Sequence, residues 1–318
     1  MATRYSFDGN SIVWQGFIND MELIQPGMSM RRSLDEMYNQ EAVRYTPIDT
    51  TTNPPTESAE TSTAVVNDTD SQNRYGIKQT VFQPPSMNRL TAGDASQLAN
   101  TILGQYKQPR RSATISSGSD NPRLVVNCKG FMWTLDWRIY NQTANSSTDN
   151  ASTILAAVIT AVGSQIAAAT NITTNNTAVQ KYFNRDDTAF NVIQWIASLG
   201  DASYNRWVAN VLENRIINYQ QAATTITYFR RLVDNRQDIF DYQNRRVPYW
   251  EIRPDSWVRT SDVYPHNITP GNLIDDVQSV YIESVDFREP DSLTLNGSTG
   301  DKLQVILARQ ANRGDALL

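Results

Sequence analysis

The order of segment types along this chain constrains its fold most, because β-like stretches at both ends enclose a centre with helical periodicity. Residues 11–23 alternate in part between apolar and polar side chains, which is typical of one or two short strands. The last third has further short runs of β-branched and aromatic residues between turn-rich linkers, at 224–229, 256–260, 279–287 and 302–310. This order predicts an α+β protein with an antiparallel C-terminal domain.

Two helices are predicted before residue 171. Leu98, Ile102 and Tyr106 recur at helical spacing within residues 91–109, and Pro109 closes that segment. Residues 152–170 are short and rich in alanine, so we expect a core helix rather than a membrane span. Its apolar side chains fall on one helical face: Ile154, Leu155, Val158, Ile159, Val162 and Ile166.

A third helix is predicted within residues 185–201. An aspartate cap at Asp186 or Asp187 precedes its apolar positions, and Gly200 supplies its C-terminal stop. Residues 203–219 fit a helix and a strand equally well, because short apolar runs do not distinguish the two.

Three further patterns concern strands and loops. Residues 50–73 are rich in Thr, Ser, Asn and Pro, which predicts a long exposed loop. Residues 74–82 are predicted to form a strand, and 123–141 to form strands with a bend at Gly130. The alternation within residues 279–287 slips by one residue, which indicates a β-bulge.

Two adjacent arginines, Arg31 and Arg32, precede a Ser-Leu-Asp-Glu turn. Ser33 and Glu36 have the spacing of a capping box, which predicts a short helix after them. We expect both arginines to pair with acidic groups within or between subunits.

Similar basic pairs occur at Arg110-Arg111, Arg230-Arg231 and Arg245-Arg246. Acidic residues follow each pair, which favours solvated faces or subunit ion pairs over a phosphate-binding track. We therefore name Arg31, Arg32, Arg230 and Arg231 as candidate subunit-interface residues.

The charge balance argues against a nucleic-acid-binding surface, since the formal net charge is −5. Only 5 of the 28 basic residues are lysines, and this arginine bias fits extensive protein–protein surface. A single cysteine, Cys128, excludes an internal disulfide framework and is consistent with folding in a reducing cytosol. No apolar run has the length of a signal peptide or a membrane span, so we expect a soluble chain.

The residues that carry common enzyme chemistry are nearly absent. His266 is the one histidine and is expected in a surface turn, while Cys128 is expected as a small buried apolar residue. The acidic pairs Asp186-Asp187 and Asp275-Asp276 are candidate carboxylate pairs for glycoside or metal chemistry, but helix capping explains the first better. We expect no enzyme activity and name no catalytic residue, cofactor-binding residue or metal ligand.

Several segments in order resemble the hub-like minor tail proteins of long-tailed bacteriophages, which are related to contractile-tail baseplate hubs. They are WQGFINDMEL, MRRSLDEMYNQEAVRYTP, RYGIKQTVF, AGDASQLANTILGQYKQP, DDTAFNVIQWIASLGD, YWEIRPDSWVRTSDVYP and DDVQSVYIESVDFREPDSLTL. The resemblance implies two split-barrel, β-barrel-like domains, at 1–85 and 223–318, with a mixed α/β region at 86–222 between them. The loop at about 50–73 has no counterpart in that family.

The resemblance also implies a function. Such a chain would be a structural virion protein that forms a homo-oligomeric ring, expected to be a trimer, and joins the tail tube to distal, tip or fibre proteins. DNA or a tape-measure protein would pass through its channel, and assembly would take place in the host cytoplasm. The alternative is a carbohydrate-binding receptor module at the tail tip, with exposed aromatic residues stacked on sugars. An enzyme that acts on cell-wall material through the acidic pairs ranks last.

Overall fold

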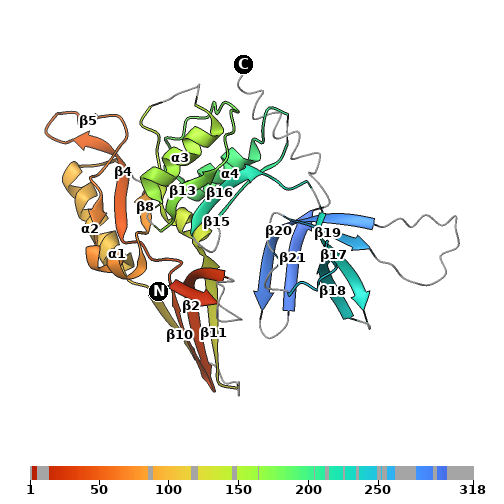
Figure 1. The fold of residues 1–318 in the computed structure, drawn as a ribbon. Helices are drawn as coiled ribbons and strands as arrows, with labels where there is room; N and C mark the ends of the chain where they lie inside the picture. The colour runs from red at the N-terminus through yellow and green to blue at the C-terminus, as the bar shows by residue number, and fades with distance from the viewer. Residues whose placement is uncertain are drawn as a thin grey trace.

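The computed structural model shows an α+β protein, which confirms the α+β part of the predicted fold class (Figure 1). In the part of the chain that it describes there are four α-helices, one 3₁₀-helix and several open sheets, and none of these sheets closes into a barrel. No helix in this part is long and apolar enough to cross a membrane. The described residues are 2–5, 14–84, 89–115, 121–144, 149–163, 165–203, 205–211, 215–224, 226–233, 236–248, 252, 256–261, 277–288 and 292–298.

The first sheet is antiparallel and combines strands from two distant parts of the sequence. Strand β2 (Trp14–Gln25) and strand β3 (Met28–Ser33) form a hairpin, whose turn contains Gly27 at a φ of 74°, a conformation that favours glycine. Strand β10 (Arg110–Ile115) pairs with β3, and strand β11 (Arg123–Gly130) pairs with β2. Strand β1 (Ala2–Tyr5) pairs with the start of β2. We call β2, β3, β10 and β11 the projecting sheet, because they extend from the rest of the chain in Figure 1.

The second sheet is built around β4 (Gln40–Asp49). Three two-residue strands pair with it antiparallel and two strands pair with it in parallel: β5 (Thr56–Glu57), β6 (Thr61–Ser62), β7 (Val66–Asn67), β8 (Gln79–Phe82) and β9 (Arg89–Leu90). Helix α2 (Ala92–Tyr106) packs against β4 through buried Ala95, Ala99 and Leu103. The predicted helix at 91–109 is thereby confirmed, and Thr91 caps its N-terminus.

The central region contains the largest buried cluster. Helices α3 (Ala151–Val162) and α4 (Ala189–Ser198) pack together, and the apolar face predicted for the first of them is buried. The neighbouring elements are the 3₁₀-helix η1 (Phe131–Trp137) and strands β12 (Ile139–Tyr140), β13 (Ala167–Ile172), β14 (Asp187–Thr188), β15 (Trp207–Val211) and β16 (Ile216–Gln221). Strands β15 and β16 form an antiparallel pair, which decides the open alternative at 203–219 in favour of strands.

The last described sheet has the strand order β18, β17, β19, β20, β21, and all its pairs are antiparallel except β17 with β19. The register between β20 and β21 shifts between Ile282 and Ser284, which confirms the bulge predicted in residues 279–287. The strand bounds are β17 (Ile226–Val233), β18 (Arg236–Asp241), β19 (Ser256–Ser261), β20 (Val277–Arg288) and β21 (Ser292–Ser298).

Two local predictions based on helix capping were wrong. No helix follows Ser33, because β3 continues as a paired strand to that residue and the Ser33 hydroxyl accepts from the amide of Asp35 at 3.1 Å. Neither aspartate caps α4: Thr188 does so, while Asp186 has a φ of 58° and Asp187 lies in β14. In both cases a residue expected to cap a helix instead lies in a strand that pairs with a distant segment: Ser33 pairs with β10, and Asp187 pairs with β12.

Other element boundaries also differ from the prediction. Residues 131–137 form η1 instead of a strand, and α3 ends at Val162, so that the following residues reach β13. The expected strand at 74–82 is restricted to β8, since Arg74 and Tyr75 end helix α1 (Thr69–Tyr75). Residues 50–73 are largely exposed as predicted, although they contribute β5, β6, β7 and most of α1.

Candidate interaction surface

The projecting sheet has one apolar face and one polar face. Residues directly opposite each other in an antiparallel pair point to the same side, so the register assigns each side chain to a face. The mostly apolar face contains Met21, Leu23, Met28, Met30, Ala113, Ile115, Leu124 and Val126, together with Gln25, and has Arg32 and Arg111 at one end. The mostly polar face contains Asp20, Glu22, Ser29, Arg31, Ser33, Arg110, Ser112, Thr114, Arg123 and Asn127, together with Ile24 and Val125.

The apolar face is open to solvent. Ile115 is 86% exposed and Leu124 is 61% exposed, and Met21, Met30 and Val126 are exposed as well. Sheets normally bury an apolar face against a second layer, and a contiguous exposed apolar patch marks an interaction site. This face therefore has the properties of a contact surface for another protein.

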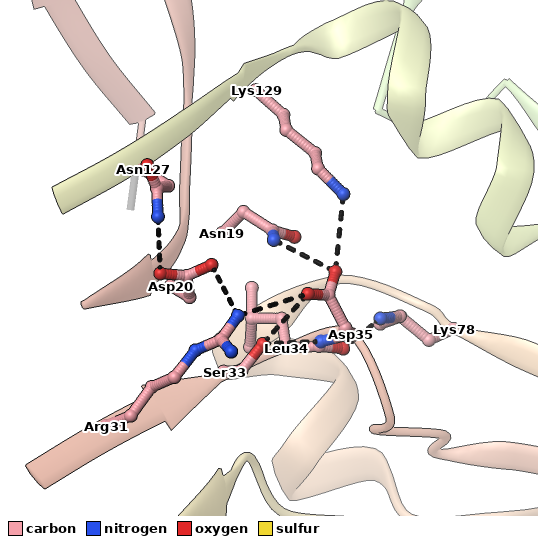
Figure 2. A network of polar contacts seen from close by, with 9 residues as sticks. All are labelled: Asn19, Asp20, Arg31, Ser33, Leu34, Asp35, Lys78, Asn127 and Lys129. Atoms are coloured by element: carbon pink, nitrogen blue, oxygen red, sulfur yellow. Dashed lines mark hydrogen bonds and ion pairs between the residues drawn. The ribbon is translucent and has the colours of Figure 1, made fainter. Parts of the chain in front are cut away.

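On the polar face, Arg31 belongs to a network at the base of the projecting sheet (Figure 2). Its guanidinium lies 3.0 Å from the carboxylate of Asp20 and 3.9 Å from that of Asp35. Asp20 is buried and also accepts from the Asn127 side chain at 2.8 Å. Arg31 thus pairs with acidic groups of its own chain, as predicted, and its role at a subunit interface stays a prediction.

Asp35 connects this network to the neighbouring strands. It accepts hydrogen bonds from Asn19 at 2.9 Å, from Lys129 at 3.2 Å and from the Ser33 hydroxyl at 3.1 Å. Burial alone would raise the pKa of Asp35, but these hydrogen bonds and the charge of Lys129 hold the pKa below its ordinary value. The ionised carboxylate therefore links β2, β3 and β11 where the projecting sheet begins, as Figure 2 shows.

Arg32 lies on the apolar face and has different partners. Its guanidinium donates to the hydroxyl of Tyr75 at 2.7 Å, and its central carbon lies 5.9 Å from the centre of that ring. Arg111 is directly opposite Arg32 on β10 and is exposed. Two like charges in directly opposed positions repel, so this end of the apolar face favours an anionic partner.

A cavity of about 580 Å³ adjoins Arg32. It lies between β2, β3, α1, η1 and the residues before β13 and β16. Its lining combines aromatic rings, amides and arginines: Phe17, Tyr75, Phe131, Trp137, Asn19, Asn73, Gln72, Gln165, Arg32, Arg74 and Arg215, together with Ile18, Asp20, Met21, Ser33, Leu34, Gly76, Pro109 and Thr134.

The other basic pairs lie elsewhere. Arg110 forms an ion pair with Glu36, and Arg245 lies 3.0 Å from Asp241. The candidate interface residues Arg230 and Arg231 lie in β17, at register positions opposite Ile239 and Asp238 of β18.

The residues weighed for catalysis do not form a site where the structure describes them. Asp186 forms an ion pair with Arg44 and accepts from Asn141 at 2.7 Å. Cys128 is exposed on β11, so the expectation of a buried residue was wrong. No described group of three or more His, Cys, Asp or Glu residues is arranged to hold a metal ion. His266, Asp275 and Asp276 lie outside the described residues.

Two buried ionisable side chains were missed by the sequence analysis. Glu41 is fully buried, and neither carboxylate oxygen has a hydrogen-bond partner in the described part of the chain, so burial raises its pKa to about 7. The one available signal was its alternation with the buried Val43 and Tyr45 along β4.

Lys78 is the second of these side chains. Burial lowers its pKa to about 8, while its ammonium group donates to the carbonyl of Leu34 and lies 5.0 Å from the Trp137 ring. No local sequence pattern indicated this position, because both contacts join segments that are far apart in the chain.

Comparisons with family models, curated proteins and solved structures give no match for this chain.

Proposed function

We propose that this chain is a structural virion protein, a tail hub or adaptor that joins the tail tube of a long-tailed bacteriophage to its distal tip. The order of sequence segments supports the family, and one structural observation carries the role: the open apolar face of the projecting sheet. A subunit of a ring needs an apolar surface that is exposed in the single chain and covered by a neighbouring subunit in the assembly. The polar network at the base of the sheet supplies the fixed geometry that such a contact needs.

In this proposal the chain assembles as a homo-oligomer, a trimer, around a channel for DNA or a tape-measure protein. The proposal keeps two barrel-like domains, at 1–85 and 223–318, with a mixed region at 86–222 between them, although the described sheets are open and the N-terminal sheets also include β9, β10 and β11. Its other partners are tube, distal-tail, tip or fibre proteins, and it acts in the virion after assembly in the host cytoplasm. The contacts of the candidate arginines with such partners belong to the same proposal.

Assembly is tested on the purified chain by negative-stain imaging and by light scattering after size-exclusion chromatography. We expect class averages with three-fold or six-fold symmetry and a central opening. Replacing Ile115 and Leu124 together with lysine should weaken assembly about a hundredfold or more, because two exposed apolar contacts are lost.

The control is Thr114→Lys, since Thr114 is also exposed on β10 but belongs to the polar face. This variant should assemble like the original chain. Monomers at every concentration tested, or normal rings from the double-lysine variant, would count against the proposal.

A receptor-binding role at the tail tip is the second candidate, and it is favoured by one exposed aromatic residue. Trp133 is 45% exposed and stacks on Phe190, with ring centres 5.3 Å apart and planes inclined by 11°. A tryptophan held in this way offers a rigid surface for a sugar ring. If this candidate is correct, the isolated chain will bind a defined set of glycans on an array, and Trp133→Ala will abolish that binding while leaving the folded structure intact.

A further inference from the structure

The cavity beside Arg32 is strongly biased toward positive charge. Three arginines line it, Arg32, Arg74 and Arg215, against a single carboxylate, Asp20. That carboxylate also accepts from Arg31 and Asn127. An anion that enters the cavity therefore meets more guanidinium groups than carboxylates in its lining.

The walls of the same cavity are aromatic. The Phe17 ring lies 4.7 Å from that of Trp137 and 6.3 Å from that of Phe131, between ring centres. The guanidinium of Arg215 lies 4.2 Å from the centre of the Phe131 ring. Flat rings beside guanidinium groups favour a ligand that carries apolar or aromatic groups next to its negative charge.

The cavity is continuous with the apolar face of the projecting sheet. Met21 and Arg32 line the cavity and also belong to that face, where Val126 lies directly opposite Met21. The apolar surface thus extends from the aromatic walls along the strands. An occupant of both parts needs to be longer than a small molecule.

We propose that this cavity and the adjoining apolar face bind an acidic segment of a partner polypeptide. Its carboxylates would meet Arg32, Arg74 and Arg215. Its apolar or aromatic side chains would lie on the partly exposed Tyr75 and Trp137, behind which Phe17 and Phe131 are buried, and on the exposed methionines. The small extent of the cluster favours a peptide over nucleic acid, because three arginines around one cavity do not form an extended phosphate track. Because the ring contact of the proposed function would cover the apolar face, the segment would occupy the cavity alone in an assembled ring and the cavity together with that face in the unassembled chain.

The binding test uses the full chain and a fluorescently labelled random copolymer of glutamate and tyrosine, followed by fluorescence anisotropy. Polyglutamate of equal length and an oligothymidylate of equal charge serve as comparison ligands. We expect the copolymer to bind most tightly and its affinity to fall as salt is raised, because charge supplies part of the binding. Tighter binding of the oligonucleotide, or no binding of the copolymer, would overturn the peptide assignment.

The location is tested with Arg32→Gln, Arg74→Gln and Arg215→Gln. Each should weaken copolymer binding about tenfold through the loss of one charged hydrogen-bonding group. Arg123→Gln is the matched control, since Arg123 is exposed on the polar face and does not line the cavity. Equal losses in the control and the three cavity variants would place the binding elsewhere, and circular dichroism of each variant separates lost binding from lost folding.

Discussion

Replacing Glu41 with leucine is expected to stabilise the folded chain by about 3 kcal/mol at about pH 7.5. The carboxyl group is fully buried and has no hydrogen-bond partner in the described structure, so its charged form is costly in the folded state. Leucine has a similar volume and needs no partner, which removes that cost. Urea unfolding monitored by circular dichroism measures the change.

The pH dependence identifies the cause. The unfolded chain releases the Glu41 proton near its ordinary pKa of 4.5, whereas the folded chain holds it up to a pKa of about 7. Between these values the folded state binds more protons than the unfolded state, so stability falls as pH rises and the loss is complete above about pH 7. Glu41→Gln should abolish this fall, although its buried amide still lacks a partner.

Two comparisons separate the effect of Glu41 ionisation on stability from the effects of other charged side chains. Glu36→Gln removes an exposed carboxylate that pairs with Arg110, so it should change stability by about 0.5 kcal/mol or less. Lys78 gives the opposite trend, since its lowered pKa makes stability rise with pH above about 8, and the comparison is therefore made between about pH 5 and pH 7.5. An unchanged pH profile in Glu41→Gln would contradict the assignment to Glu41.

Local periodicity predicted α2, α3 and α4, but not α1 or η1. The apolar face of α3 depends on residues within a few turns of one another, so the sequence pattern contains the necessary information. In α2 the helix is as predicted, but its buried residues are Ala95, Ala99 and Leu103 rather than Leu98, Ile102 and Tyr106. The prediction of a helix after Ser33 was wrong for the opposite reason. The conformation at Ser33 depends on pairing with β10, which lies more than 70 residues later in the chain.

The interaction surface was predictable only in part. An acidic partner for Arg31 was expected, and Asp20 and Asp35 are close to it in sequence. The third connection could not be expected, because Asn127 is 107 residues away from Asp20. The apolar face likewise appears only when β10 and β11 are placed beside the β2–β3 hairpin, since each strand alone shows a short and weak alternation.

A second large effect is expected in the central region, where Phe183→Ala should destabilise the chain by about 3–5 kcal/mol. Phe183 is fully buried, and its ring meets that of Trp195 edge to face with 5.4 Å between centres. Truncation to alanine leaves a void in a cluster that rigid neighbours fill only in part. The midpoint of urea unfolding measures the loss.

The matched control is Phe190→Ala, because Phe190 is only partly buried and packs on the exposed Trp133. This change should cost about 1–2 kcal/mol, since much of the lost surface already faces water. Phe183 shares its cluster with Leu135 of η1, the helix that carries Phe131 and Trp137 of the arginine-lined cavity. Phe183→Ala should therefore also weaken binding of the acidic copolymer under conditions in which the chain is still folded. Equal stability losses in the two phenylalanine variants would contradict the expected difference in burial, and unchanged copolymer binding in Phe183→Ala would show that this cluster does not support the cavity.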